Sequence, residues 1–194
     1  MGKKQVKQKG EITMETINDI VKENNMNKKY ELTDETKEIG GITLHRIRAL
    51  MDISRYGVRA GDIGGWIEAE SNLSQYGNAW VSDDARVYGN AKVYGDTWVY
   101  GDALVNGNAE VSGNAEVKGI RDYAVFKNGW SSGRWFTYTR SNRMWRVGCF
   151  HGTGEELTAK AYKDSELSGK CYEAIVRAAE TIEAAQAETK GEAK

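Results

Sequence analysis

Few residues in this chain are suited to covalent or metal chemistry, because it contains only two histidines and two cysteines. Cys149 and His151 lie two positions apart, a spacing at which strand side chains share a face, and a thiolate beside an imidazole can act as a nucleophile. Nothing in the sequence identifies a third group that would orient the imidazole. We therefore assign no catalytic residue, and the cysteine spacing indicates neither a zinc site nor a disulfide framework. No cofactor is expected.

A denser chemical signal lies at 120–150, where arginines and a lysine alternate with aromatic residues and only one acidic residue occurs. Such a mixture binds single-stranded nucleic acid or nucleotides through stacking and charge. The same surface also suits a protein partner. In a third interpretation, the aromatic residues pack into a core and the arginines are solvated. The candidate binding residues are Arg134, Arg140, Arg143, Arg146, Trp130 and Trp145.

Residues 66–119, which precede these candidates, consist of a six-residue unit that is repeated many times. This repeat decides the fold of the middle of the chain. Each unit reads Gly-Asn-Ala-x-Val-x. Asp replaces the Asn in some units, and Thr97 replaces the Ala in one. The small residue and the valine face one side of a short strand, and the Gly-Asn pair turns the chain. Stacking such units buries each valine, at about 1.5–3 kcal/mol apiece, so the period predicts a solenoid. The valines are Val81, Val87, Val93, Val99, Val105, Val111 and Val117.

The array resembles the left-handed parallel β-helix of hexapeptide-repeat proteins. That resemblance implies three hexads in each triangular coil, so positions eighteen apart would stack on one face. One face would then carry Trp80, Trp98 and Tyr100 pointing outward. An exposed aromatic patch of this kind usually marks an interface. We expect either another subunit, in a homo-oligomer, or the C-terminal part of the same chain to cover these three residues.

The fold class predicted for the chain is mainly β, with a small C-terminal α+β module made of a hairpin and two helices. In that module Thr153 and Glu156 predict a helix-capping box. The hairpin consists of strands at 135–139 and 144–150, and the helices lie near 154–164 and 169–186. The predicted organisation is an N-terminal extension at 1–25 with a short amphipathic helix, a β cap at 26–65, the repeats at 66–119, the α+β module at 120–186 and a disordered tail at 187–194.

The composition of the chain indicates the cellular compartment in which the protein is found. The net charge is −1, and no apolar run reaches the length of a membrane span. The two cysteines suit a reducing compartment. We therefore expect a cytoplasmic protein that does not associate with membranes.

Several motifs resemble a group of hexapeptide-repeat proteins that is common in phages and prophages, some of which carry a transferase label. The resemblance rests on Leu44-His-Arg-Ile-Arg-Ala49, on Gly61-Asp-Ile-Gly-Gly-Trp66, on the repeats, and on Trp130-Ser-Ser-Gly-Arg-Trp-Phe-Thr-Tyr138. It implies a viral protein that acts in the host cytosol. With no chemistry visible in the sequence, the leading hypothesis is a non-enzymatic protein that binds a host protein and inhibits a host defence system.

Three alternatives remain open at this stage. The basic and aromatic hairpin favours a binder of nucleic acid or nucleotides. Many hexapeptide-repeat coils are trimeric acyltransferases, but they use a histidine on a coil or on a loop from it, and His45 and His151 both lie outside the array. The chain could also be a scaffold that only oligomerises.

Overall fold

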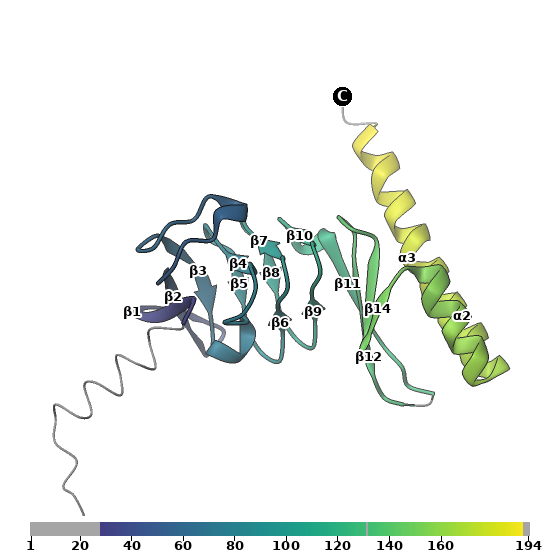
Figure 1. Ribbon diagram of the computed structural model, residues 1–194. Helices are drawn as coiled ribbons and strands as arrows, with labels where there is room; N and C mark the ends of the chain where they lie inside the picture. The colour runs from purple at the N-terminus through teal and green to yellow at the C-terminus, as the bar shows by residue number, and fades with distance from the viewer. Residues whose placement is uncertain (1–27, 131, 192–194) are drawn as a thin grey trace, which may run out of the picture.

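The computed structural model describes residues 28–130 and 132–191, which form three layers (Figure 1). A coiled body comes first, a four-stranded sheet stands across its end, and two helices cover the far side of that sheet. The predicted extension at 1–25, with its helix, lies outside the described residues. In the part of the chain that is described, no helix is both long enough and apolar enough to cross a membrane.

The N-terminal cap is a hairpin followed by a strand that joins it to the coil. Strands β1 (Tyr30–Ile39) and β2 (Ile42–Ala49) pair antiparallel around Gly40 and Gly41, whose φ angles of 58° and 83° favour glycine. Strand β3 (Ile63–Ile67) pairs antiparallel with β2 on one side and parallel with β5 on the other. The cap is thus a hairpin turned by two glycines, and parallel pairing with the next coil begins at Trp66.

The coil has three parallel sheets, β3-β5-β8, β4-β7-β10 and β6-β9, and every strand in them except β3 has two residues. Paired positions are eighteen residues apart, as in Trp80 with Trp98 and Trp98 with Glu116, so the predicted stacking is confirmed. Asp83 replaces the missing glycine of one turn at a φ of 55°. The strands are β4 (Trp80–Val81), β5 (Arg86–Val87), β6 (Lys92–Val93), β7 (Trp98–Val99), β8 (Leu104–Val105), β9 (Glu110–Val111) and β10 (Glu116–Val117).

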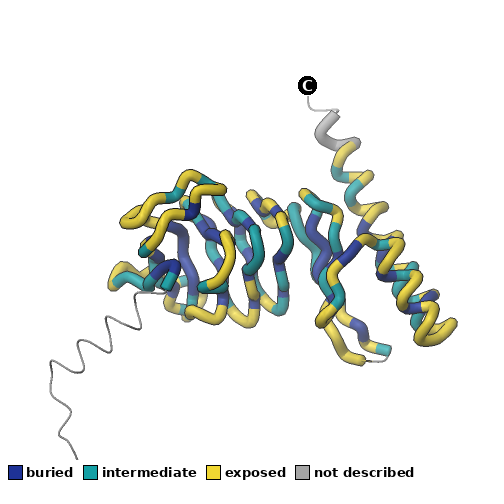
Figure 2. The backbone as a smooth tube through the Cα atoms, viewed as in Figure 1, coloured by how far each residue is buried: buried dark blue, intermediate teal, exposed yellow. Residues whose placement is uncertain are grey.

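The small residue and the valine of every repeat are buried inside the coil, as the alternation predicted (Figure 2).

Three short 3-10 helices complete this half of the molecule. They are η1 (Ser54–Tyr56) in the cap, η2 (Glu70–Asn72) at the first turn of the coil, and η3 (Ile120–Asp122) directly after the last coil strand.

The aromatic face of the coil is covered in a way the sequence did not predict. Trp80 is only 1% exposed, because β3 of the chain's own cap lies against it. Tyr56 of the cap stacks on Trp98 at 5.1 Å between ring centroids, and Trp98 stacks on Tyr100 at 4.4 Å. The expectation that the C-terminal module or another subunit covers Trp80 is therefore wrong. Trp98 and Tyr100 remain half-buried.

Gly64 of β3 allows this close approach, and replacing it should be costly. A Cβ atom there would lie 2.6 Å from Ile47 Cγ1, from Trp80 Cζ2 and from the Val81 carbonyl oxygen. We expect Gly64→Ala to lower the free energy of unfolding by about 1–3 kcal/mol, measured by urea denaturation. Gly119→Ala is the control, because its Cβ would meet only Asp122 Oδ2, at 4.0 Å. Equal stability of the two variants would contradict the packing of Trp80 against β3.

Lys29 closes the N-terminal end of the coil. Its side chain is 1% exposed, and its Nζ donates a hydrogen bond of 2.6 Å to the carbonyl oxygen of Ala79. Burial lowers the pKa of Lys29 to about 8 from its usual 10.5, since removing an ammonium group from water disfavours the charged form.

This pKa makes stability depend on pH in a predictable direction. Between pH 8 and 10.5 the unfolded chain binds more protons at Lys29 than the folded chain, so stability rises with pH in that window. We expect the free energy of unfolding to increase by about 1 kcal/mol from pH 7.5 to pH 9. Above pH 10 the raised pKa values of Tyr30 and Tyr138 act in the opposite direction. The rise should vanish in Lys29→Met; a rise of equal size in that variant would contradict this assignment.

The C-terminal module is an antiparallel sheet followed by two helices. Strands β11 (Tyr123–Lys127), β12 (Trp135–Thr139), β13 (Met144–Val147) and β14 (Phe150–Gly152) lie in chain order. The predicted strand at 144–150 is wrong in part, because Gly148, at a φ of 56°, turns the chain and divides it into β13 and β14. Trp145 pairs with Tyr138 of β12 on one side and Gly152 of β14 on the other.

Helices α2 (Gly154–Asp164) and α3 (Glu166–Gly191) cover one face of this sheet (Figure 1). The predicted capping box is confirmed, with Thr153 Oγ1 accepting from the Glu156 amide at 3.2 Å and Glu156 Oε2 accepting from the Thr153 amide at 2.9 Å. Helix α3 is longer than predicted, since its alanine- and glutamate-rich C-terminal part favours helix. The predicted disordered tail is therefore wrong for 187–191, while 192–194 lie outside the described residues.

Both faces of the sheet are covered. Phe136, Tyr138 and Trp145 face the helices and form a core with Leu157 and Val176. On the other face, Thr137 Oγ1 accepts a hydrogen bond of 2.9 Å from the backbone amide of Glu110. Ser141 Oγ, in the following turn, accepts one of 2.8 Å from the amide of Glu116. The last coil strands thus find hydrogen-bond partners in the C-terminal module, which caps the end of the coil.

Candidate functional site

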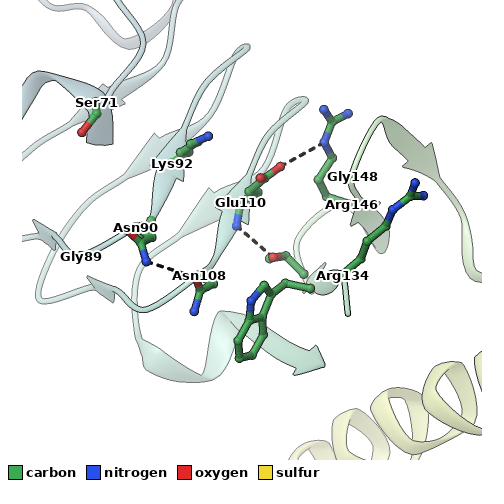
Figure 3. Close-up of a pocket in the computed structure, with 12 residues that line it drawn as sticks. Ser71, Gly89, Asn90, Lys92, Asn108, Glu110, Arg134, Arg146 and Gly148 are labelled. Atoms are coloured by element: carbon green, nitrogen blue, oxygen red, sulfur yellow. Dashed lines mark hydrogen bonds and ion pairs between the residues drawn. The ribbon is translucent and has the colours of Figure 1, made fainter. Parts of the chain in front are cut away.

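A groove with a volume of about 500 Å³ lies where the coil meets the C-terminal sheet. One side consists of the coil sheet β6-β9 and the turns next to it, and the other consists of β12, β13 and the turn after β13 (Figure 3). Most of the residues that line it are polar or charged. The lining residues are Ser71, Gly89, Asn90, Ala91, Lys92, Asn108, Glu110, Arg134, Trp135, Thr137, Arg146 and Gly148.

The coil side of the groove is built by the eighteen-residue register. Lys92 and Glu110 are paired positions of β6 and β9, and both project outward beside the buried Val93 and Val111. Asn90 and Asn108 hold the same relation in the preceding turns, where Asn90 Nδ2 donates to Asn108 Oδ1 at 3.3 Å. A rigid backbone ladder therefore fixes the spacing of all these side chains.

The sheet side anchors one arginine against the coil. Arg146 Nε donates to Glu110 Oε2 at 3.5 Å (Figure 3). The Arg146 guanidinium also lies 5.4 Å from the ring centroid of Tyr94. The Arg146 side chain is 24% exposed and that of Glu110 is 34% exposed, so this ion pair is partly shielded from water. It holds the end of the coil and the sheet together at the bottom of the groove.

Two cations at the groove have no ion-pair partner among the described residues. They are Lys92 on the coil and Arg134 on the sheet, both exposed. The stem of Arg134 lies over the turn at Gly148, with its Cδ 3.5 Å from the position a Cβ would take there. Lys92, Arg134 and Arg146 against the single carboxylate of Glu110 leave an excess of positive charge, which favours an anionic ligand.

Trp135 adds an aromatic surface to the same groove. Its side chain is 37% exposed, and the Lys127 ammonium lies 4.9 Å from its ring centroid. The indole is a large and rigid contact surface of the type that is enriched at the centre of protein interfaces.

The structure separates the six residues predicted for binding. Arg134 and Arg146 meet at the groove, whereas Arg140 binds Gln186 and Arg143 Nη2 lies 3.4 Å from Glu183 Oε1, both on α3. These last two arginines therefore belong to a different surface. The two tryptophans of the set pack against the core of the module, as in the interpretation that places the aromatic residues in a core.

Trp145 is 2% exposed and packs between the sheet and the helices. Trp130 is half-buried, with its ring 6.1 Å from that of Tyr172 in an edge-to-face contact. The indole of Trp145 is therefore not available to stack on a base, and that of Trp130 is available only in part.

Lys92, Glu110 and Trp135 were not predicted to be members of one site. The signal for the first two was available, since they stand eighteen residues apart in the array. Trp135 belonged to the hairpin already singled out, but nothing in the sequence indicates which face of that hairpin meets the coil.

The two residues considered for nucleophilic chemistry do not lie on one strand. Cys149 lies in the turn between β13 and β14, so the strand spacing that would bring it beside His151 does not apply. His151 instead lies against Gly113 of the coil. Burial and, to a smaller extent, the charge of Arg146 lower the pKa of His151. Among the described residues, no group of three or more metal-binding side chains comes together.

The groove, with its excess of cations and its exposed indole, is thus the strongest candidate for a contact surface. No protein-family model matches the chain, and no curated protein matches it.

Proposed function

We propose that this chain is a non-enzymatic binding protein whose groove grips an acidic segment of another protein. The observation that carries the proposal is that Lys92 and Arg134, which have no ion-pair partner among the described residues, line the same groove as the exposed Trp135. In this proposal the coil is a left-handed β-helix that serves as a stem. The sheet and the helices complete the contact surface at its end.

A protein partner suits this surface better than a nucleic acid does. Binding of single strands relies on aromatic side chains that offer free faces to successive bases, and of the two tryptophans predicted for this role Trp145 is buried and Trp130 is half-buried. The groove also places the Glu110 carboxylate and two asparagines beside its cations. This mixture of donors and acceptors suits the backbone and side chains of a peptide segment.

The setting of the proposed activity follows from the resemblance to phage hexapeptide-repeat proteins. We propose that the partner is a host protein in the cytosol and that binding inhibits a host defence system. Self-association through Trp98 and Tyr100, which stay half-buried, remains part of the proposal, while the buried Trp80 is excluded from that interface.

Charge reversal at the groove tests the proposed function. Lys92→Glu combined with Arg134→Glu should abolish capture of the partner from a bacterial lysate by the tagged chain, because both substitutions repel an acidic segment. Lys160→Glu combined with Lys163→Glu on the exposed face of α2 changes the net charge equally and should retain capture. Equal capture by both variants, or capture of nucleic acid alone, would contradict the proposal.

A further inference from the structure

We propose that strand β11 (Tyr123–Lys127) is a docking edge, to which an extended acidic segment of the partner adds as a further strand. This inference rests on the proposed binding function and names the way in which the partner chain is held. Strand β11 is an edge of the C-terminal sheet, since the strand order is β11-β12-β13-β14. An edge strand presents backbone donors and acceptors that can pair with an added strand.

The register identifies the groups that point outward. The Arg140 amide donates to the Asp122 carbonyl oxygen at 2.8 Å, and the Asn128 amide donates to the Arg134 carbonyl oxygen at 2.9 Å. Hydrogen-bonded pairs alternate along an antiparallel ladder, so even-numbered residues of β11 bond to β12. The amides and carbonyls of Tyr123, Val125 and Lys127 therefore face away from β12.

Hollows adjoin this edge on both faces of the sheet. A hollow of about 360 Å³ on the coil side is lined by Trp135, Val125 and Asn106, among others. A smaller one of about 120 Å³ on the helix side is lined by Ala124, Ile182 and Arg140, among others. Alternate side chains of an added strand point to opposite faces, so these hollows would receive them in turn.

Exposed apolar side chains surround the same edge. Ile120, which borders both hollows, is 65% exposed, and Ile182 on α3 is 47% exposed. Trp135 lines the coil-side hollow and the cationic groove at the same time. A partner segment that pairs with β11 can therefore continue past this indole into the groove.

The charged side chains at the edge of β11 favour an acidic partner segment. Arg121 and Lys127 are exposed at its two ends. Two carboxylates near this edge already have partners. Asp122 Oδ2 accepts from the amides of Lys118 and Gly119, both at 2.8 Å, and Glu183, in the helix-side hollow, accepts from the Tyr138 hydroxyl and pairs with Arg143. A second copy of the chain paired edge to edge would bring Arg121 and Lys127 of both copies together. Repulsion between these cations disfavours such a pair, whereas acidic side chains on a partner strand would meet opposite charges.

Proline at position 125 tests the edge without breaking the sheet. The Val125 amide faces outward, so Val125→Pro removes a donor from the edge and leaves the ladder to β12 in place. The probe is a fluorescein-labelled synthetic peptide in which Glu and Val alternate, followed by fluorescence anisotropy. We expect Val125→Pro to weaken its binding by roughly tenfold or more, and Val125→Ala, which measures the side-chain contribution alone, by a clearly smaller factor. A peptide in which Lys and Val alternate should not bind.

Amide hydrogen exchange of the wild-type chain provides the second measurement and needs no variant to fold. Saturating amounts of the Glu-Val peptide should slow exchange at Tyr123, Val125 and Lys127. Unchanged exchange at these amides, or equal binding by Val125→Pro and wild type, would overturn the edge proposal. If the groove reversal still abolishes partner capture in that case, the proposed function stands and only the docking edge fails. If the groove reversal leaves partner capture intact and the peptide leaves amide exchange unchanged, both the proposed function and the docking edge are overturned.

Discussion

Val105→Asp should unfold the coil, and this is the largest effect we expect from a single substitution. Val105 is fully buried in β8 among the other repeat valines, where a carboxylate would have neither water nor a cation. Burying an unpaired charge costs several kcal/mol, which is a large part of the stability of a typical domain. Circular dichroism during thermal denaturation should show either no cooperative transition or one at a much lower temperature.

The neighbouring residue provides a matched control. Leu104 occupies the same strand but points outward and pairs with Arg86 on the adjacent coil, so an aspartate there would face a cation. We expect Leu104→Asp to change the free energy of unfolding by less than about 1 kcal/mol. Similar melting temperatures for Val105→Asp and wild type would contradict the inward register of the repeat.

Trp145→Ala should cause the second large loss of stability, about 3–5 kcal/mol. The indole is 2% exposed and contacts Phe126, Phe136 and Tyr138, with ring centroids 5.0 to 6.5 Å from its own. Removing it would leave a cavity between the sheet and the helices. Urea denaturation followed by circular dichroism measures the loss.

Trp135→Ala is the comparison that separates a core tryptophan from a contact tryptophan. Its side chain is 37% exposed, so its loss should cost less than about 1 kcal/mol of stability. It should nevertheless weaken partner binding. A Trp145→Ala protein as stable as Trp135→Ala would show that the core does not depend on Trp145.

The coil could be predicted from sequence because a single period sets both its pairing and its burial. Once Val81 and Val99 occupy the same place in the repeat, their strands pair and both side chains point inward. The hairpin at Gly40-Gly41 and the capping box at Thr153 were predictable for a similar reason, since each depends on a few residues that are close in the chain.

Contacts between segments that are far apart in the chain could not be predicted in this way. Trp80 occupies an outward position of the repeat, and only the approach of Gly64 from the cap buries it. The orientation of the hairpin is a second case. Whether Trp135 or Phe136 faced the coil depended on hydrogen bonds such as that between Glu110 and Thr137, which the spacing of residues does not reveal. The groove could therefore not be predicted from the sequence, because it forms only where the folded coil meets the sheet.

Photocrosslinking from the groove tests most directly the claim that this surface grips an acidic protein segment. The photoreactive amino acid p-benzoylphenylalanine would replace Trp135, and in a second protein it would replace Tyr76, which is 85% exposed on a coil turn. Position 135 should form an adduct with a protein in the bacterial lysate. Mass spectrometry should place that adduct in an acidic peptide, and position 76 should form none. Adducts of equal yield at both positions, or adducts with nucleic acid alone, would contradict the binding of an acidic protein segment at the groove.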